Sequence, residues 1–284
     1  LGKMMTSALT CLRDRLFYTN PKSGRHISYW RREPAGADAA TRTMVFMHGF
    51  NGNSRSWYYQ FNYFRACRLI SVDAPGFGDT SIFEGGIAGF ADEVAMMLSD
   101  LGLRSVWMIG HSMGGMVAQI LAACHNSCCA GLILSCTHKG RGEPKDAPLS
   151  DEVIERIEQR SRLNDKDYGT LRIRRMLTGK LPPEVHDFLV SIAGEIRIEG
   201  IKWGGAAIQY LDTTPYLENI KSPTLILSAA NDIVVKKEAL NALIASLPAA
   251  KHMEISSVGH APYCEDADTF NRIIQQFITN HEEL

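Results

Sequence analysis

Three residues far apart along the chain, Ser112, Asp232 and His260, have the side chains of a nucleophile, an acid and a base. Ser112 is the centre of Gly110–Gly114, a G-x-S-x-G pattern that indicates a sharp turn with the serine hydroxyl exposed. A serine is a weak nucleophile at neutral pH, so it needs a base within hydrogen-bond reach and a group that orients the base. The order Ser, Asp, His therefore predicts acyl transfer by a catalytic triad.

The neighbouring segments must bring these three residues together. Ser112 is expected to lie between a buried strand over 106–109 and a helix of small residues. Asp232 follows a second apolar run over 224–229, and His260 follows a short strand and a glycine. Functional groups in an open α/β sheet gather outside the C-terminal ends of the strands. We therefore expect all three side chains at one edge of a sheet.

Another group of residues is suited to stabilise a developing oxyanion. An apolar run over 43–47 is followed by His48-Gly49-Phe50, and a glycine in such a loop lets a backbone N–H face the nucleophile. The N–H groups of Phe50 and Met113 are the expected donors. His48 is expected to fix the loop, and Asp212 is the alternative acid.

Together these residues resemble the α/β-hydrolase superfamily. The matching motifs are His48-Gly49-Phe50, Asp73-Ala74-Pro75-Gly76-Phe77-Gly78, Gly110-His111-Ser112-Met113-Gly114-Gly115, Asn231-Asp232 and Gly259-His260-Ala261-Pro262. The resemblance extends from about Arg25 to Ile278 and is weakest between His138 and Asp212. It implies the serine-nucleophile branch that holds small-molecule esterases, enol-lactonases and carbon–carbon bond (meta-cleavage product) hydrolases.

The order of the predicted elements indicates an α/β fold. After an antiparallel hairpin near the N-terminus, apolar strands alternate with helices, which predicts a mostly parallel sheet with helices on both faces. Residues 1–137 and 213–284 would form this core. The segment 138–212 is expected to be a helical insertion, and the resemblance implies that it is a lid over the active site.

The insertion contains the residues that we expect near a substrate. Arg172, Arg174 and Arg175 are close in sequence, and a guanidinium can bind a carboxylate through two hydrogen bonds. Helical spacing puts Arg172 and Arg175 on roughly one side, with Arg174 elsewhere. The same arginines would also suit a solvated helix face. Trp203 could line the pocket or belong to the core of the lid, and His138 could line the pocket or lie on the surface.

Composition limits the partners of the chain. A net charge of −1 over 284 residues argues against nucleic acid or an anionic membrane as the main partner. No apolar run approaches the roughly 20 residues of a membrane span, and Leu1–Met5 lacks the features of a signal peptide. Seven cysteines without a disulfide pattern predict a reducing cytoplasm. The crowded segment Cys124–Cys129 has no second ligand pair, so we expect no metal and no cofactor. A homo-oligomer is left open.

These observations predict a serine hydrolase that cleaves a small carboxylic ester or lactone through an acyl-enzyme. The substrate would be a small molecule, with a carboxylate if a lid arginine binds it. One alternative is hydrolysis of a carbon–carbon bond in a dienol-keto acid, with the same residues. A second alternative is a ligand receptor on a hydrolase scaffold, although a receptor does not require an intact triad.

Overall fold

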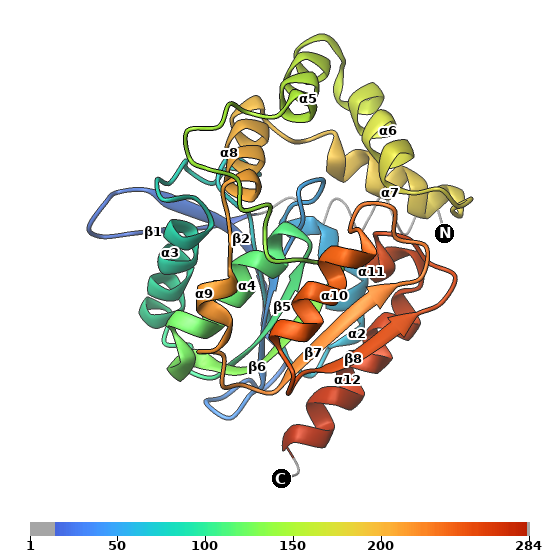
Figure 1. The fold of residues 1–284 in the computed structure, drawn as a ribbon. Helices are drawn as coiled ribbons and strands as arrows, with labels where there is room; N and C mark the ends of the chain where they lie inside the picture. The colour runs from blue at the N-terminus through green and yellow to red at the C-terminus, as the bar shows by residue number, and fades with distance from the viewer. Residues whose placement is uncertain (1–14, 283–284) are drawn as a thin grey trace.

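The computed structural model describes residues 15–282, and its centre is one eight-stranded sheet (Figure 1). The strands lie in the order β1-β2-β4-β3-β5-β6-β7-β8. β1 pairs antiparallel with β2, β2 pairs antiparallel with β4, and all other pairs are parallel. The strand bounds are β1 Leu16–Thr19, β2 His26–Arg32, β3 Thr43–Met47, β4 Arg68–Val72, β5 Val106–His111, β6 Cys129–Ser135, β7 Thr224–Ala229 and β8 Lys251–Ile255. The predicted mostly parallel sheet is confirmed.

Helices cover both faces of this sheet, because the strands are apolar on both sides. In β3, Val45 and Met47 belong to one buried cluster, while Met44 and Phe46 belong to the other. The first face packs against α3 (Gly86–Asp100), α4 (Met113–Cys124), α9 (Thr214–Leu217) and α10 (Lys237–Ser246). The opposite face packs against α2 (Tyr58–Tyr63), α11 (Pro262–Glu265) and α12 (Ala267–Glu282). Two short 3-10 helices, Ser54–Trp57 and Asn126–Cys128, complete the connections.

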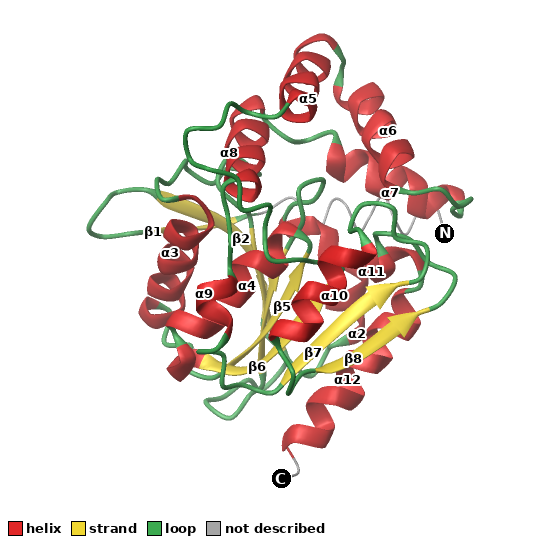
Figure 2. Ribbon diagram, viewed as in Figure 1, coloured by secondary structure: helices red, strands yellow, loops and turns green. Residues whose placement is uncertain are grey.

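Four more helices lie between β6 and β7 in the chain. They are α5 (Asp151–Arg162), α6 (Asp165–Met176), α7 (Pro183–Ala193) and α8 (Ile198–Gln209). Figure 2 shows them beyond the end of the sheet at which the parallel strands finish, and α5 packs against α8 while α6 packs against α7. The Ser150 hydroxyl caps α5 by accepting a hydrogen bond from the Val153 N–H, as Ser, Thr, Asp and Asn commonly do at a helix start. We call these four helices the inserted helices.

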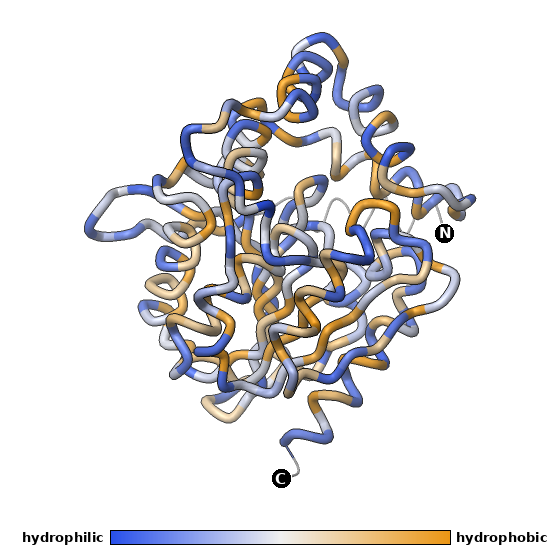
Figure 3. Tube along the Cα trace, viewed as in Figure 1, coloured by the Kyte–Doolittle hydropathy of each residue, from blue (hydrophilic) through white to orange (hydrophobic). Residues whose placement is uncertain are grey.

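Hydropathy follows this arrangement. Apolar segments concentrate in the sheet and on the inner sides of the helices, whereas the outer turns of the inserted helices are hydrophilic (Figure 3). Within residues 15–282, no helix is both long and apolar enough to cross a membrane. The segment Leu1–Met5 lies outside the described residues.

Close packing at the start of α4 requires glycine. A Cβ atom added at Gly114 would lie 2.0 Å from the carbonyl oxygen of Met47, at the end of β3. A Cβ atom added at Gly110 would lie 2.3 Å from the carbonyl oxygen of Gly114. Because these neighbours are backbone atoms, they have little freedom to move aside. The two glycines therefore let α4 begin directly against the ends of β3 and β5.

The substitution Gly114→Ala should destabilise the fold. The new methyl group would push α4 away from β3, and overpacking of this kind costs about 3 kcal/mol at the upper end of its usual range. Gly179→Ala is the matched control, because a Cβ atom at Gly179 meets nothing within 4 Å. Urea unfolding of the two variants measures the difference. Equal free energies of unfolding for both variants would contradict the packing argument.

Candidate active site

Ser112 lies at a strained turn between β5 and α4. Its φ angle is 52° and its ψ angle is −117°, a combination that residues with a side chain rarely adopt. The backbone is held from both sides: the Ser112 N–H donates to the Ser135 carbonyl oxygen at 2.8 Å, and the Thr137 hydroxyl donates to the Ser112 carbonyl oxygen at 2.6 Å. The turn therefore depends on the end of β6 as well as on the G-x-S-x-G sequence.

Asp232 and His260 form a buried hydrogen-bonded pair. Nδ1 of His260 lies 2.9 Å from Oδ2 of Asp232, and the two side chains are 6% and 7% exposed. The other carboxylate oxygen, Oδ1, accepts the backbone N–H groups of Val234 and Val235 at 2.8 and 3.1 Å. Burial alone would raise the pKa of Asp232, but the hydrogen bond and charge of His260, with these N–H groups, hold that pKa below its ordinary value. Asp232 therefore stays ionised and orients the imidazole.

His111 connects the turn to this pair. Its ring centroid lies 4.8 Å from that of His260, and its Nδ1 is 3.1 Å from the Ser135 hydroxyl. Burial lowers the pKa of His111 well below its ordinary value, with the nearby His260 acting in the same direction. The ring is therefore neutral at pH 7. Among the described residues, no hydrogen bond joins the Ser112 hydroxyl to His260, whose Nδ1 bonds to Asp232.

Glu265, in the short helix α11, positions the loop that carries His260. Its carboxylate accepts the N–H of Gly259 at 3.0 Å from both oxygens, and Oε2 also accepts the N–H of Ala261 at 3.0 Å. The residues on both sides of His260 are thus fixed by one side chain. Glu265 was not predicted from the sequence. The pattern that could have indicated it is an acidic residue five positions after His260.

His48 fixes the loop that follows β3. Its Nε2 accepts the N–H of Ala74 at 2.9 Å, so the proton must reside on Nδ1, which donates to the Gly49 carbonyl oxygen at 2.7 Å. Burial lowers the pKa of His48, which keeps this neutral form at pH 7. A Cβ atom at Gly49 would lie 3.1 Å from the Cβ of Ser112, so this loop is in direct contact with the serine turn.

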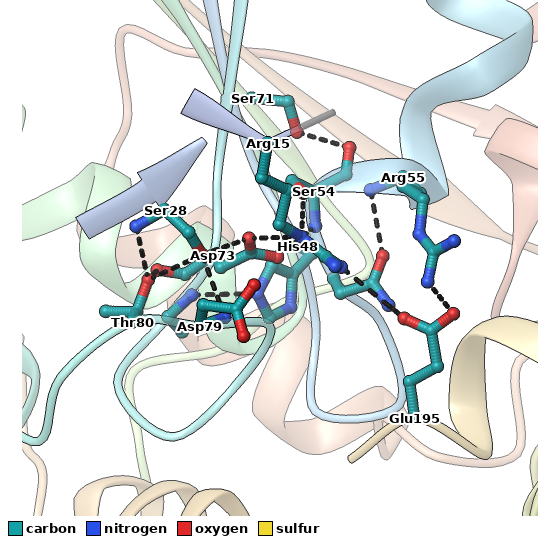
Figure 4. A network of polar contacts seen from close by, with 12 residues as sticks. Arg15, Ser28, His48, Ser54, Arg55, Ser71, Asp73, Asp79, Thr80 and Glu195 are labelled. Atoms are coloured by element: carbon teal, nitrogen blue, oxygen red, sulfur yellow. Dashed lines mark hydrogen bonds and ion pairs between the residues drawn. The ribbon is translucent and has the colours of Figure 1, made fainter. Parts of the chain in front are cut away.

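A polar network extends from this loop to the inserted helices (Figure 4). At its centre, buried Asp73 accepts the Ser28 hydroxyl at 2.6 Å and the Ser54 N–H at 2.7 Å, and it pairs with Arg15 at 2.9 Å. Arg15 also lies 3.4 Å from Glu195, which follows α7. Arg55 makes an ion pair with the same carboxylate. Charged groups of the core and of the inserted helices are therefore bonded to one another near the serine turn.

The alpha/beta hydrolase fold family matches residues 42–267, which include Ser112, Asp232 and His260. The chain belongs to that family. An AB hydrolase superfamily protein of Bacillus subtilis is 25% identical over 83% of this chain and 91% of its own length. A 2-succinyl-6-hydroxy-2,4-cyclohexadiene-1-carboxylate synthase of Salmonella newport is 34% identical, but over only 35% of this chain and 40% of its own length.

Solved structures with the same fold cover nearly the whole α/β-hydrolase chain. A malate-bound thermophilic esterase from Thermogutta terrifontis superposes with a TM-score of 0.79 at 23% identity, covering 94% of this chain and 99% of its own. The enol-lactonase from Burkholderia xenovorans superposes with a TM-score of 0.78 at 20% identity, covering 90% and 98%. At these identities the likeness establishes the fold.

The remaining predicted residues of this α/β-hydrolase occupy different environments. Arg172 is buried, whereas Arg174 and Arg175 are exposed, and Arg175 pairs with Glu155 at 3.1 Å. Asp212, the alternative acid, is exposed and accepts the Thr214 N–H at the start of α9. The acid bonded to His260 is therefore Asp232.

Trp203 and His138 lie on different sides of the site. The indole N–H of Trp203 donates to the Phe83 carbonyl oxygen at 3.1 Å, and its ring meets Phe90 of α3 edge-on at 5.9 Å. This ring belongs to the packed interior between α8 and α3. His138 is half-buried and accepts the Gly140 N–H at 3.0 Å; burial chiefly lowers its pKa, and the charges of His260 and Asp232 also act on it. His138 therefore lies near the hydrogen-bonded pair.

Within residues 15–282, the potential metal ligands that converge are Cys136, Asp232 and His260, whose ligand atoms lie within 4.8 Å of one another. Burial and the Asp232 charge raise the pKa of the Cys136 thiol well above its ordinary value, which disfavours the thiolate that binds metals. Asp232 and His260 already bond to each other. In the segment considered for metal binding, Cys124 is exposed and Cys129 half-buried.

The stability contributed by Asp232 should depend on pH. Its folded-state pKa is below that of the unfolded chain, about 3.9 for an aspartate, so its contribution is present above that pH and is lost as the pH falls through the folded value. The free energy of unfolding of the wild type should therefore exceed that of Asp232→Asn at neutral pH. Denaturant titrations between pH 7 and pH 3 should show that this difference in the free energy of unfolding decreases below about pH 4. A gap that widens on acidification would contradict the assignment.

Proposed function

We propose that this protein is a serine hydrolase that cleaves a small carboxylic ester or lactone through an acyl-enzyme at Ser112. The observation that carries the proposal is the buried Asp232–His260 hydrogen bond of 2.9 Å beside the strained Ser112 turn. A turn serving only to connect β5 and α4 does not require a neighbouring ionised acid and an oriented imidazole. In the proposed reaction these groups supply the nucleophile, the base and the group that orients the base.

The proton transfers follow from the hydrogen bonds of the pair. Asp232 is ionised and bonded to Nδ1 of His260, which leaves Nε2 free to take the proton of the Ser112 hydroxyl. The serine oxygen then attacks the substrate carbonyl. His260 returns its proton to the leaving alcohol oxygen as the acyl–oxygen bond breaks. A water molecule, deprotonated by His260, then attacks the acyl-enzyme. As the acyl–serine bond breaks, His260 returns this proton to the Ser112 oxygen, which releases the acid and restores the enzyme.

The N–H groups of Phe50 and Met113 are the proposed oxyanion donors. Met113 is the first residue of α4, and the first N–H groups of a helix have no partner within it. The Gly49 carbonyl oxygen points to Nδ1 of His48. In a trans peptide the N–H points away from the carbonyl oxygen, so the N–H of the Gly49–Phe50 peptide is directed to the opposite side. The Phe50 N–H is therefore available on the side away from His48. Both donors would stabilise charge on the substrate oxygen during attack.

We infer that the segment 138–212 serves as a lid over this site. A Cβ atom added at Gly204 of α8 would lie 2.5 Å from Cε2 of Phe50 and 3.3 Å from Sδ of Met113. One inserted helix thus packs directly on the two residues whose N–H groups would hold the oxyanion. His138, at the entrance to the segment, is a candidate pocket residue. Trp203 would act from within the lid by holding α8 on α3.

Replacement of the nucleophile tests the proposal. Ser112→Ala should lower kcat by about 10⁴–10⁶-fold, the loss observed when a triad serine is removed. Ser256→Ala is the control: Ser256 is exposed in the turn that follows β8, and its replacement should leave turnover at the wild-type level. Multiple turnovers of a screened panel of esters and lactones provide the measurement. A folded Ser112→Ala variant with more than a tenth of wild-type turnover would overturn the proposal.

The same assay separates the alternatives. An ester hydrolase releases an acid and an alcohol, and a lactone hydrolase releases one hydroxy acid. A carbon–carbon hydrolase releases two products that were joined by the broken carbon–carbon bond. Mass analysis of the products distinguishes these cases. A receptor would bind its ligand without repeated turnover.

A further inference from the structure

Two arginines of the inserted helices, one buried and one half-buried, lack a full set of hydrogen-bond acceptors. Arg172 of α6 is 4% exposed, and the side chain of Arg156 of α5 is 14% exposed. Among the described residues, Nε of Arg156 and Nε of Arg172 are buried donors without a hydrogen-bond partner. A buried polar donor without an acceptor is costly, more so when it is charged. Among residues 15–282, acceptors for these two Nε groups are therefore missing.

The charges around the two arginines are also unbalanced. Arg156 pairs with Glu152 at 2.9 Å, but Glu152 also pairs with Arg141 at 3.1 Å. Nη1 of Arg172 donates to Oε1 of the neutral Gln159 side chain, at a long 3.4 Å. Burial, followed by the positive charge of Arg156, lowers the pKa of Arg172 to about 10, which still leaves it protonated at pH 7. Glu152 is therefore shared between Arg156 and Arg141, and positive charge is in excess around Arg156 and Arg172.

Arg156 lies next to the proposed oxyanion site. Cζ of Arg156 is 4.6 Å from the centre of the Phe50 ring, and the backbone N–H of the same phenylalanine is a proposed oxyanion donor. The guanidinium is thus separated from that donor by one phenylalanine side chain. Gly204 of α8 packs on another part of the same ring. A substrate held at Ser112 would therefore extend toward Arg156 beneath the inserted helices.

We propose that Arg156 and Arg172 together bind a carboxylate of the substrate, so that the enzyme acts on esters or lactones of dicarboxylic acids in which one acid is free. This inference rests on the proposed function of Ser112. A planar carboxylate can accept two parallel N–H groups from a guanidinium. An anionic group on the substrate would offset the excess positive charge around Arg156 and Arg172. Arg174 and Arg175 are exposed and do not belong to this site.

The test compares substrates that differ only in charge. Ethyl half-esters of succinic, glutaric and adipic acid are each paired with the ester in which a primary amide replaces the free acid. For wild type, kcat/KM should be higher on the acid than on the amide for at least one chain length. Arg156→Gln and Arg172→Gln should each lower this acid-to-amide ratio about ten- to a hundredfold, the range for a hydrogen bond to a charged group. Arg174→Gln, on the same helix but exposed, is the matched control and should leave the ratio unchanged.

The outcomes for the two proposals are distinguishable. Turnover that depends on Ser112 but has equal ratios in wild type and both arginine variants would overturn the carboxylate site alone. Turnover that persists in Ser112→Ala would overturn the proposed function. Retained activity on the amide ester shows that a variant is folded. If Arg172→Gln does not fold, the acid-to-amide ratio of Arg156→Gln decides whether the carboxylate site exists. Isothermal calorimetry measures binding without turnover. Glutarate should bind the Ser112→Ala variant but not the double variant that carries both Ser112→Ala and Arg156→Gln. Equal binding of glutarate to both variants would contradict the carboxylate site.

Discussion

Ser112 has a φ angle of 52°, in a region that costs a residue with a side chain about 1–3 kcal/mol. This conformation persists because the surrounding backbone fixes it from two directions, through Ser135 on one side and Thr137 on the other. Gly110 and Gly114 permit the close contact of β5, α4 and β3 that the turn requires. The strained turn directs the hydroxyl away from the strand, and the rest of the site is arranged around it.

The order of the strands explains how distant segments reach that turn. β5 lies between β3 and β6, so the His48–Phe50 loop arrives on one side of Ser112 and the end of β6 on the other. β7 and β8 follow in order, and their C-terminal loops carry Asp232 and His260. Parallel pairing places all of these strand ends at one edge. The Glu265 carboxylate then accepts backbone N–H groups on both sides of His260, and the backbone N–H groups of Val234 and Val235 hold the Asp232 carboxylate.

Most of the fold could be predicted because it depends on local patterns. Apolar runs bounded by glycines mark the buried strands, and the G-x-S-x-G pattern marks the turn at Ser112. The His48-Gly49-Phe50 loop could be predicted in the same way, because it directly follows an apolar run. The Asp232–His260 bond was predicted from strand ends, because the sheet topology is regular at that edge.

Residues that act through tertiary contacts could not be predicted in the same way. Glu265 supports His260 through backbone N–H groups, and Glu195 bonds to Arg15 and Arg55, from a distant part of the chain. Helical spacing grouped Arg172 with Arg175, but packing of α6 against α7 and α5 buries only the former. Arg156 was not singled out, because only the structure brings α5 over Phe50. Charge patterns alone do not determine which arginine faces the interior.

The most direct test of this account is covalent labelling with a fluorophosphonate, which reacts with a serine activated by a neighbouring base. Intact-protein mass spectrometry should show one adduct per chain, and peptide mapping should locate it on Ser112. The His260→Ala variant should label far more slowly, because it lacks the base. An adduct on another residue, or equally rapid labelling of Ser112 without His260, would contradict the proposed nucleophile and base.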